Sequence, residues 1–143
     1  KITRQIRSLA DTEKYNPRVK LLRSAPGIGL ITAMEFLTEI ESMDRFNRID
    51  CFQSYIGFVP STFSSGERER TGKITPRGHG FLRSALIEST WTAVRHDPVL
   101  TQKYEELKLR MSGSHAIVRV AKKFLNKIYF VLKNNQPYQV GQP

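Results

Sequence analysis

Apolar residues recur every three or four positions along most of this chain, and this spacing predicts a series of α-helices. The strongest stripe lies in residues 115–134, and its apolar members are Ile117, Val120, Ala121, Phe124, Leu125, Ile128 and Leu132. Ser114, directly before this stripe, is the expected N-cap of the helix. Residues 30–40 and 81–95 carry shorter stripes with the same period. Together these stripes predict an all-α fold.

The pattern also predicts how the chain is divided. Residues 1–17 have the character of the end of an upstream linker helix, which Pro17 interrupts. Residues 18–135 are expected to form one domain, because a chain of this length fits one domain with a sizeable core. Residues 136–143 lack an apolar period and are predicted to be a mobile tail.

A helix-hairpin-helix element is predicted around the turn Pro26-Gly27-Ile28-Gly29. A short apolar run precedes this turn, and the helix predicted at residues 30–40 follows it. Gly27 and Gly29 let the backbone turn tightly, and the free amides of such a turn can face the phosphates of one DNA strand. The alternative is a packing corner without a ligand. Four nearby carboxylates favour that alternative: Glu35, Glu39, Glu41 and Asp44.

Residues 57–83 follow neither a helical nor a strand period, and their composition indicates a binding loop. A serine-rich and glycine-rich run is mixed with five basic side chains: Arg68, Arg70, Lys73, Arg77 and Arg83. His79 lies between Gly78 and Gly80 at the entry to the next helix, where unpaired backbone amides favour an anion. We expect an irregular loop or short hairpin that presents Ser65-Gly66 to a phosphate. An ordinary connecting turn is the alternative.

Positive charge is concentrated at both ends of the chain and in this central segment. The formal net charge is +10; residues 1–23 carry seven basic and two acidic side chains, and residues 101–143 carry eight and two. Such a distribution favours a polyanionic partner, most simply DNA. A basic surface that serves only solubility is the alternative.

A basic stripe shares the last predicted helix with the apolar stripe. Its members are Arg119, Lys122, Lys123 and Lys127, again at spacings of three and four residues. A solvated helix face usually mixes both signs of charge, whereas residues 113–134 contain no carboxylate. We therefore expect this stripe to face phosphates, with simple solvation as the alternative.

The remaining composition argues against several classes of protein. The single cysteine, Cys51, cannot form an internal disulfide, which fits a reducing cytoplasm. One cysteine and three scattered histidines cannot assemble a zinc-type cluster, so no metal site is expected in this chain. No apolar run approaches the length that a membrane-spanning helix needs.

Several short motifs, taken in their order along the chain, resemble one family. They are Pro-Gly-Ile-Gly-x-x-Thr-Ala at 26–33, Ser-Tyr-x-Gly-x-x-Pro at 54–60, Ser-Gly at 65–66, Gly-x-Ile-Thr at 72–75, Arg-Gly-x-x-x-Leu-Arg at 77–83 and Arg-x-x-Pro at 95–98. With a basic final helix, this series resembles the C-terminal transposase domain of the bridge-RNA-guided insertion-sequence transposases, the family that includes the pilin-gene invertase. The resemblance covers about residues 18–135.

The resemblance implies a DNA recombinase that cleaves and rejoins strands. Family members carry an N-terminal ribonuclease-H-like domain whose four acids bind metal, so Mg²⁺ is expected there and not in this chain. The serine of the Ser-Gly motif is the family's nucleophile, which implies Ser65, with Ser64 as the neighbouring competitor. A guide RNA, a homo-oligomer and the cytoplasm of a bacterium or archaeon are implied as well.

Two other classes of function stay open at this stage. The chain could be a non-catalytic helix-hairpin-helix module that lends nucleic-acid affinity to another domain, or a domain whose helices mediate oligomerisation. Without the ribonuclease-H-like domain, we expect this chain alone to be inactive in recombination.

Overall fold

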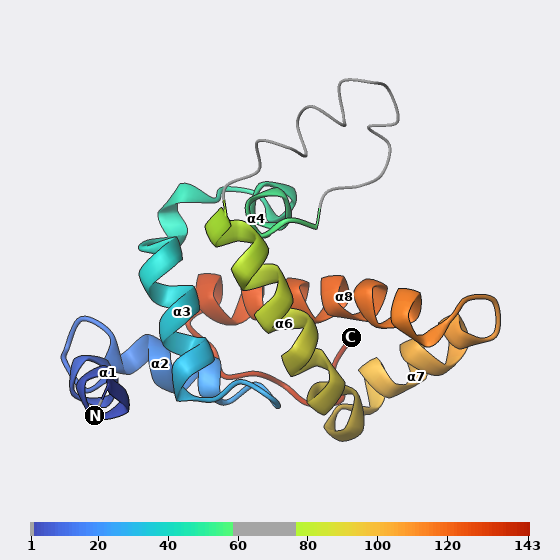
Figure 1. The fold of residues 1–143 in the computed structure, drawn as a ribbon, viewed down its shortest axis with the longest axis horizontal. Helices are drawn as coiled ribbons and strands as arrows, with labels where there is room; N and C mark the ends of the chain where they lie inside the picture. Colours follow the sequence, from blue (N-terminus) through green and yellow to red (C-terminus); the bar gives the residue numbers. More distant parts are fainter. Residues whose placement is uncertain (1, 59–76) are drawn as a thin grey trace.

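In the computed structural model of the 143-residue chain, residues 2–58 and 77–143 are described. The regular elements in these two ranges are all helical, which confirms the all-α prediction for the part of the chain that is described. They are α1 (Ile2–Ala10), α2 (Asn16–Arg23), α3 (Leu30–Ile40), a 3₁₀ turn (Met43–Arg45), α4 (Ile49–Ile56), α6 (Arg77–His96), α7 (Pro98–Lys108) and α8 (Gly113–Asn134). Figure 1 shows α8 lying across the molecule behind α6, with α3 and α4 toward one side and α7 toward the other.

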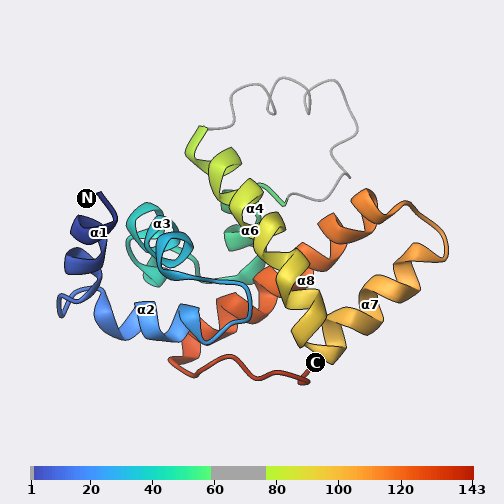
Figure 2. The same ribbon diagram turned by 60° about the horizontal axis from the view of Figure 1, so that its bottom comes forward.

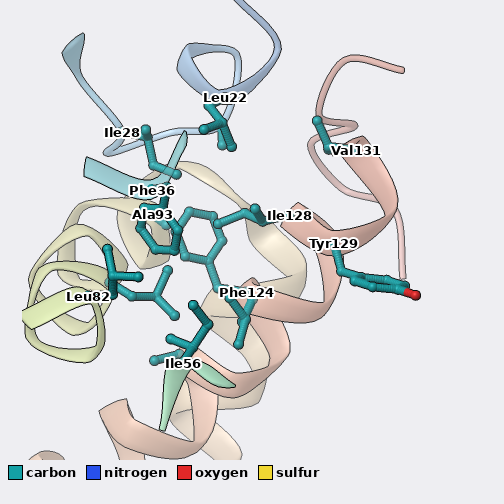
Figure 3. Packing of buried hydrophobic residues seen from close by; sticks show 14 of the residues in the cluster. Leu22, Ile28, Phe36, Ile56, Leu82, Ala93, Phe124, Ile128, Tyr129 and Val131 are labelled. Carbon is teal, nitrogen blue, oxygen red and sulfur yellow. The ribbon is translucent and has the colours of Figure 1, made fainter. Parts of the chain in front are cut away.

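Helix α8 is the element around which the others pack. It contacts α2, α4, α6 and α7, and all seven residues of its predicted apolar stripe are buried. In Figure 3, Phe36 of α3 meets Phe124 and Ile128 of α8 at the centre of the core. Burial of each such side chain contributes roughly 1.5–3 kcal/mol of transfer free energy. The helical spacing of these apolar residues therefore places them on one face of α8, and that face packs against the neighbouring helices.

Helix boundaries differ from the prediction at three places, each for a local reason. The N-cap of α8 is Ser112, not Ser114, because the Ser112 hydroxyl accepts the backbone N–H of His115. Pro17 lies in the first turn of α2, where a missing N–H costs nothing, so it begins a helix instead of only ending one. Helix α6 begins at Arg77, four residues before the apolar stripe that predicted it.

The turn between α2 and α3 is fitted closely against α6. Gly27 has a φ of +90°, and a Cβ atom placed on it would lie 2.4 Å from the carbonyl oxygen of Ser89. Gly29 is different: its φ is −96°, it forms the N-cap of α3, and an added Cβ would meet no atom within 4 Å. Internal packing therefore accounts for a glycine at position 27, but not at position 29.

Residues 136–143, predicted to be a mobile tail, run along the helices in the structure, and their mobility stays a prediction. Figure 2 shows this segment (red) leaving the end of α8 and running back past α2 toward the junction of α6 and α7. Tyr138 is only 6% exposed, and its backbone N–H donates to the hydroxyl of Ser24 at 2.9 Å. The sequence concealed this docking because its main partner, Asp97, is a single residue far away in the chain.

The carboxylate of Asp97 is completely buried at the corner between α6 and α7 and collects four donors. These are Lys127 Nζ at 2.6 Å, the Tyr138 hydroxyl at 2.5 Å, the Gly141 N–H at 3.0 Å and the Val99 N–H at 3.1 Å. Burial alone would raise the pKa of Asp97, but these hydrogen bonds outweigh burial and lower it. Burial and the adjacent carboxylate raise the pKa of Tyr138 far above its usual range, so its hydroxyl remains a donor.

Serine at position 27 should destabilise the protein, because it adds a Cβ against the Ser89 carbonyl oxygen at a backbone conformation that side chains disfavour. We expect Gly27→Ser to lower the free energy of unfolding by about 2 kcal/mol, measured by urea denaturation. Gly29→Ser is the matched control, since serine is a good N-cap and the site is open; it should stay within a few tenths of a kcal/mol. Equal stability of the two variants would contradict the packing of this turn.

Loss of the Asp97 carboxylate should also destabilise the fold, because Lys127 would keep a charge that lacks its partner. We expect Asp97→Asn to cost about 3 kcal/mol or more. The folded pKa is lowered, so the carboxylate stabilises above its unfolded pKa of about 4, and this contribution is lost as pH falls through the lower folded pKa. The stability difference between wild type and variant should therefore narrow below about pH 4. Asp50→Asn, which removes only an exposed pair with Arg48, is the control and should leave the unfolding midpoint unchanged.

Candidate nucleic-acid interface

The outward face of α8 gathers basic side chains and has no opposing charge on its own helix. Arg119 is exposed, and Lys122 and Lys123 are half-buried. Lys133 lies 11 residues after Lys122, which is close to three helical turns, so it shares this face. No Asp or Glu occurs within Gly113–Asn134. We call these four side chains, Arg119, Lys122, Lys123 and Lys133, the α8 basic face.

Lys127 belongs to a different environment, although its spacing placed it in the predicted stripe. Its side chain is only 10% exposed, and its ammonium group pairs with Asp97 and donates to the backbone oxygen of Gln139 at 3.2 Å. The ammonium also lies 4.5 Å from the centroid of the Tyr138 ring. The Lys127 side chain therefore points inward, and its ammonium group helps to hold the C-terminal segment in place.

The predicted loop residues lie outside the part of the chain that the structure describes. This applies to the expected nucleophile and to three of its basic neighbours: Ser65, Arg68, Arg70 and Lys73. Arg77 and His79 fall within the first turn of α6, but their side chains are not described. These assignments from the sequence therefore stay predictions.

Arg83 is the basic residue of this segment whose side chain is described. It is half-buried on α6, and its guanidinium lies 5.3 Å from the centroid of the Phe58 ring. A Cβ atom on Gly57 would lie 3.2 Å from the Arg83 side chain, and Gly57 itself ends α4 with a φ of +107°. Arg83 thus packs where α4 meets α6, beside the last described residue before position 59.

The two glycines of the predicted helix-hairpin-helix element are placed unequally for contact with DNA. Both glycines are exposed, but a Cβ atom on Gly27 would meet the Ser89 carbonyl oxygen of α6, whereas one on Gly29 would meet no atom within 4 Å. The carbonyl oxygen of Gly29 accepts the N–H of Ala33, as an N-cap residue does. A phosphate contact in this turn stays a prediction, and Gly29 is the better placed of the two.

The described ranges contain neither a cluster of metal-ligating side chains nor a helix of membrane-spanning character. Among residues 2–58 and 77–143, no three His, Cys, Asp or Glu side chains are grouped so that they could hold a metal ion. None of the helices in these ranges is both long and apolar enough to cross a membrane.

Three features of this interface were missed by the sequence analysis. Lys133 was overlooked because it lies six residues beyond Lys127, the last of the four basic residues that were grouped. Phe130 reads as an apolar core residue, yet it is 53% exposed at the outer face of α8. Asp97 could have been recognised from its place before Pro98, because Asp is a common N-cap; its side chain accepts the N–H of Val99.

The amino-acid sequence is similar to one family of known proteins. Residues 19–105 match the transposases of the IS116/IS110/IS902 family. The chain is 30% identical over 132 residues to the transposase for insertion sequence element IS1111A of Coxiella burnetii. It is 27% identical over 141 residues to the uncharacterized 43.6 kDa protein of insertion element IS110 of Streptomyces coelicolor.

The alignments cover nearly all of this chain but only part of each relative. They include 90% of the chain and 36% of the Coxiella protein, and 97% of the chain and 34% of the Streptomyces protein. The chain therefore spans about a third of the length of these relatives. No solved structure matches it.

Proposed function

Because this chain belongs to the IS116/IS110/IS902 family of transposases, we propose that it is the C-terminal part of an insertion-sequence transposase that binds DNA and takes part in cutting and rejoining its strands. The α8 basic face carries the proposal, because a helix of 22 residues without a carboxylate is suited to a polyanion. The family assignment supports DNA as that polyanion and transposition as the reaction class.

In this proposal the α8 basic face holds phosphates and positions the nucleic acid. Arg119 offers a planar fork of donors that can grip one phosphate with two hydrogen bonds, and Lys122 and Lys123 act as point charges. Contacts of this kind set affinity and register without reading sequence. Gly29, with its open surroundings, is proposed as a further backbone contact.

The chemical step is assigned to Ser65, whose role rests on the resemblance of the Ser-Gly motif to the family pattern. The Ser65 oxygen attacks phosphorus, a new Oγ–P bond forms and one P–O bond of the DNA backbone breaks. The hydroxyl proton leaves to a base, and the departing DNA oxygen takes up a proton. The resulting phosphoserine ester keeps the bond energy available for rejoining.

Basic residues near Ser65 would stabilise the charge that develops on the phosphoryl oxygens. The proposed set is Arg68, Arg70, Lys73, Arg77, His79 and Arg83. Arg83 has the best support, because its contacts with Gly57 and Phe58 hold it at the junction of α4 and α6. An arginine fixed in this way loses less conformational entropy when it binds an anion.

The complete reaction is proposed to need parts that this chain does not supply. A ribonuclease-H-like domain would bring Mg²⁺ and a base, a guide RNA would direct target choice, and copies of the protein would assemble as a homo-oligomer. No described group of this chain suits a metal ion, so no step is assigned to one here. The bacterial or archaeal cytoplasm is the proposed site of action.

Removal of charge from the α8 basic face should weaken DNA binding and reduce its dependence on salt. Each phosphate contact contributes about 0.9 to the slope of log K against log salt for duplex DNA. We expect the triple change Arg119→Ala, Lys122→Ala and Lys123→Ala to lower that slope by about 2–3, as measured by fluorescence anisotropy over a salt series.

A control removes the same charge from other helices. Arg4→Ala, Arg7→Ala and Lys20→Ala on α1 and α2 should change the slope much less, since these exposed residues lie outside the α8 basic face. If the two triple variants lose the same slope, net charge alone drives binding, and the assignment of the α8 basic face fails.

Ser65→Ala in the full-length transposase should abolish covalent attachment to DNA while DNA affinity stays nearly the same. The nucleophile is lost, and with it the covalent route, whereas the charges that bind the phosphates stay in place. The assay traps a phosphoserine–DNA adduct on a nicked substrate and identifies the modified peptide by mass spectrometry.

Ser64→Ala is the matched control, because it removes the neighbouring hydroxyl from the same serine pair. This variant should retain most of the adduct. An adduct that persists in Ser65→Ala, or that is lost only in Ser64→Ala, would overturn the assignment of the nucleophile.

A further inference from the structure

A small hollow lies between the second half of α8 and the docked C-terminal segment. Its volume is about 220 Å³, and its walls are mainly apolar, with Phe130 and Val131 of α8 on one side and Pro137 and Tyr138 on the other. Ligand pockets for drug-sized molecules are larger, roughly 300–1,000 Å³. The hollow therefore suits one planar ring system and not a whole nucleotide.

Side-chain amides give this hollow its polar groups. Asn134, Gln136, Gln139 and Gln142 line it, all four are exposed, and none has a side-chain hydrogen-bond partner in the described part of the chain. An amide offers both donors and an acceptor, which matches the mixed edges of nucleobases. No Asp or Glu side chain lines the hollow, and its single Lys or Arg side chain, Lys127, is engaged by Asp97.

Phe130 supplies an exposed aromatic face at the edge of the hollow. It is 53% exposed, and its ring contacts that of Tyr129 edge-on, with the two centroids 5.5 Å apart. Exposed aromatic rings next to basic side chains are the usual means of holding unpaired bases by stacking. In a duplex the bases are already stacked, so such a ring can act only on an unpaired base.

The hollow continues the α8 basic face. Phe130 follows Arg119 by 11 residues, a rise of about 16 Å along the helix, and Lys133 lies one turn further on. A nucleic-acid strand whose phosphates contact the basic face would reach the hollow at its end. Charge complementarity thus selects a nucleic acid as the occupant, and the ring-sized hollow selects an unpaired base.

We propose that this hollow binds one unpaired nucleobase of a single-stranded nucleic acid, stacked on Phe130 and hydrogen-bonded by the surrounding amides. The proposal rests on the nucleic-acid-binding function proposed above and makes it more specific. It gives the C-terminal segment a role in recognition, because docking of Tyr138 is what closes one side of the hollow.

The test measures binding of the 143-residue chain to a labelled single-stranded 12-mer and to the corresponding duplex by fluorescence anisotropy. Phe130→Ala should weaken binding to the single strand by between about 5-fold and about 100-fold, as expected for one lost base–aromatic stack. Binding to the duplex should stay within about twofold. Phe130→Tyr should keep the affinity, because it retains the ring.

Two controls separate stacking from general effects. Phe81→Ala removes an aromatic ring of similar exposure, 58%, from α6 and should not change affinity for the single strand. A 12-mer with abasic sites in its centre should bind wild type more weakly than the intact strand does. Phe130→Ala should then add no further loss on the abasic strand, because the stack is already absent.

The outcomes distinguish this inference from the broader proposal. If charge removal on α8 flattens the salt dependence while Phe130→Ala changes nothing, or weakens single strand and duplex equally, nucleic-acid binding stands and the base-binding hollow is wrong. If the chain binds neither strand type in a salt-dependent manner, both proposals fall.

Discussion

The packing of α6, α7, α8 and the C-terminal segment against one another depends on the hydrogen bonds and the ion pair of the buried Asp97 carboxylate. This carboxylate caps α7, pairs with Lys127 of α8 and holds the C-terminal segment through Tyr138 and Gly141. A buried charge is tolerated only when it is paired and hydrogen-bonded, and here four donors meet that requirement. One side chain thus joins the corner of α6 and α7, the central helix and the end of the chain.

Helix α8 connects this core with the proposed interface. Its inward face supplies the buried stripe on which α2, α4, α6 and α7 pack, and its outward face carries basic residues without a carboxylate. Because four other helices pack against the inward face of α8, its basic face is held in one orientation. Rigid presentation of this kind lowers the entropy lost on binding and favours a defined register on nucleic acid.

The α4–α6 junction offers a second point of order, near the segment proposed to carry the nucleophile. Gly57 ends α4 in a left-handed conformation, and Arg83 packs over Phe58 beside it. The described residues that flank this segment in the sequence are therefore firmly packed. This junction is also connected to the helix that carries the α8 basic face, because α4 packs against both α6 and α8.

The sequence by itself determined the helices and the sign of their surfaces. A period of 3.6 residues is a local property, so the apolar stripe of α8 and the span Leu30–Ile40 could be predicted from neighbouring residues. The motifs Pro-Gly-Ile-Gly and Ser-Gly indicated the transposase family, because their order along the chain is specific even where each motif alone is weak.

Only the tertiary structure decided which side chains are available for binding. Lys122 and Lys127 share a helix and a charge, but Lys127 turns to a buried carboxylate 30 residues away, and spacing along one helix cannot show that. The same holds for Gly27, whose neighbour is a carbonyl of α6, and for Tyr138, whose hydroxyl partner lies 41 residues earlier. Contacts between distant segments depend on how whole helices pack, and for that reason local patterns predict the elements but not the partners.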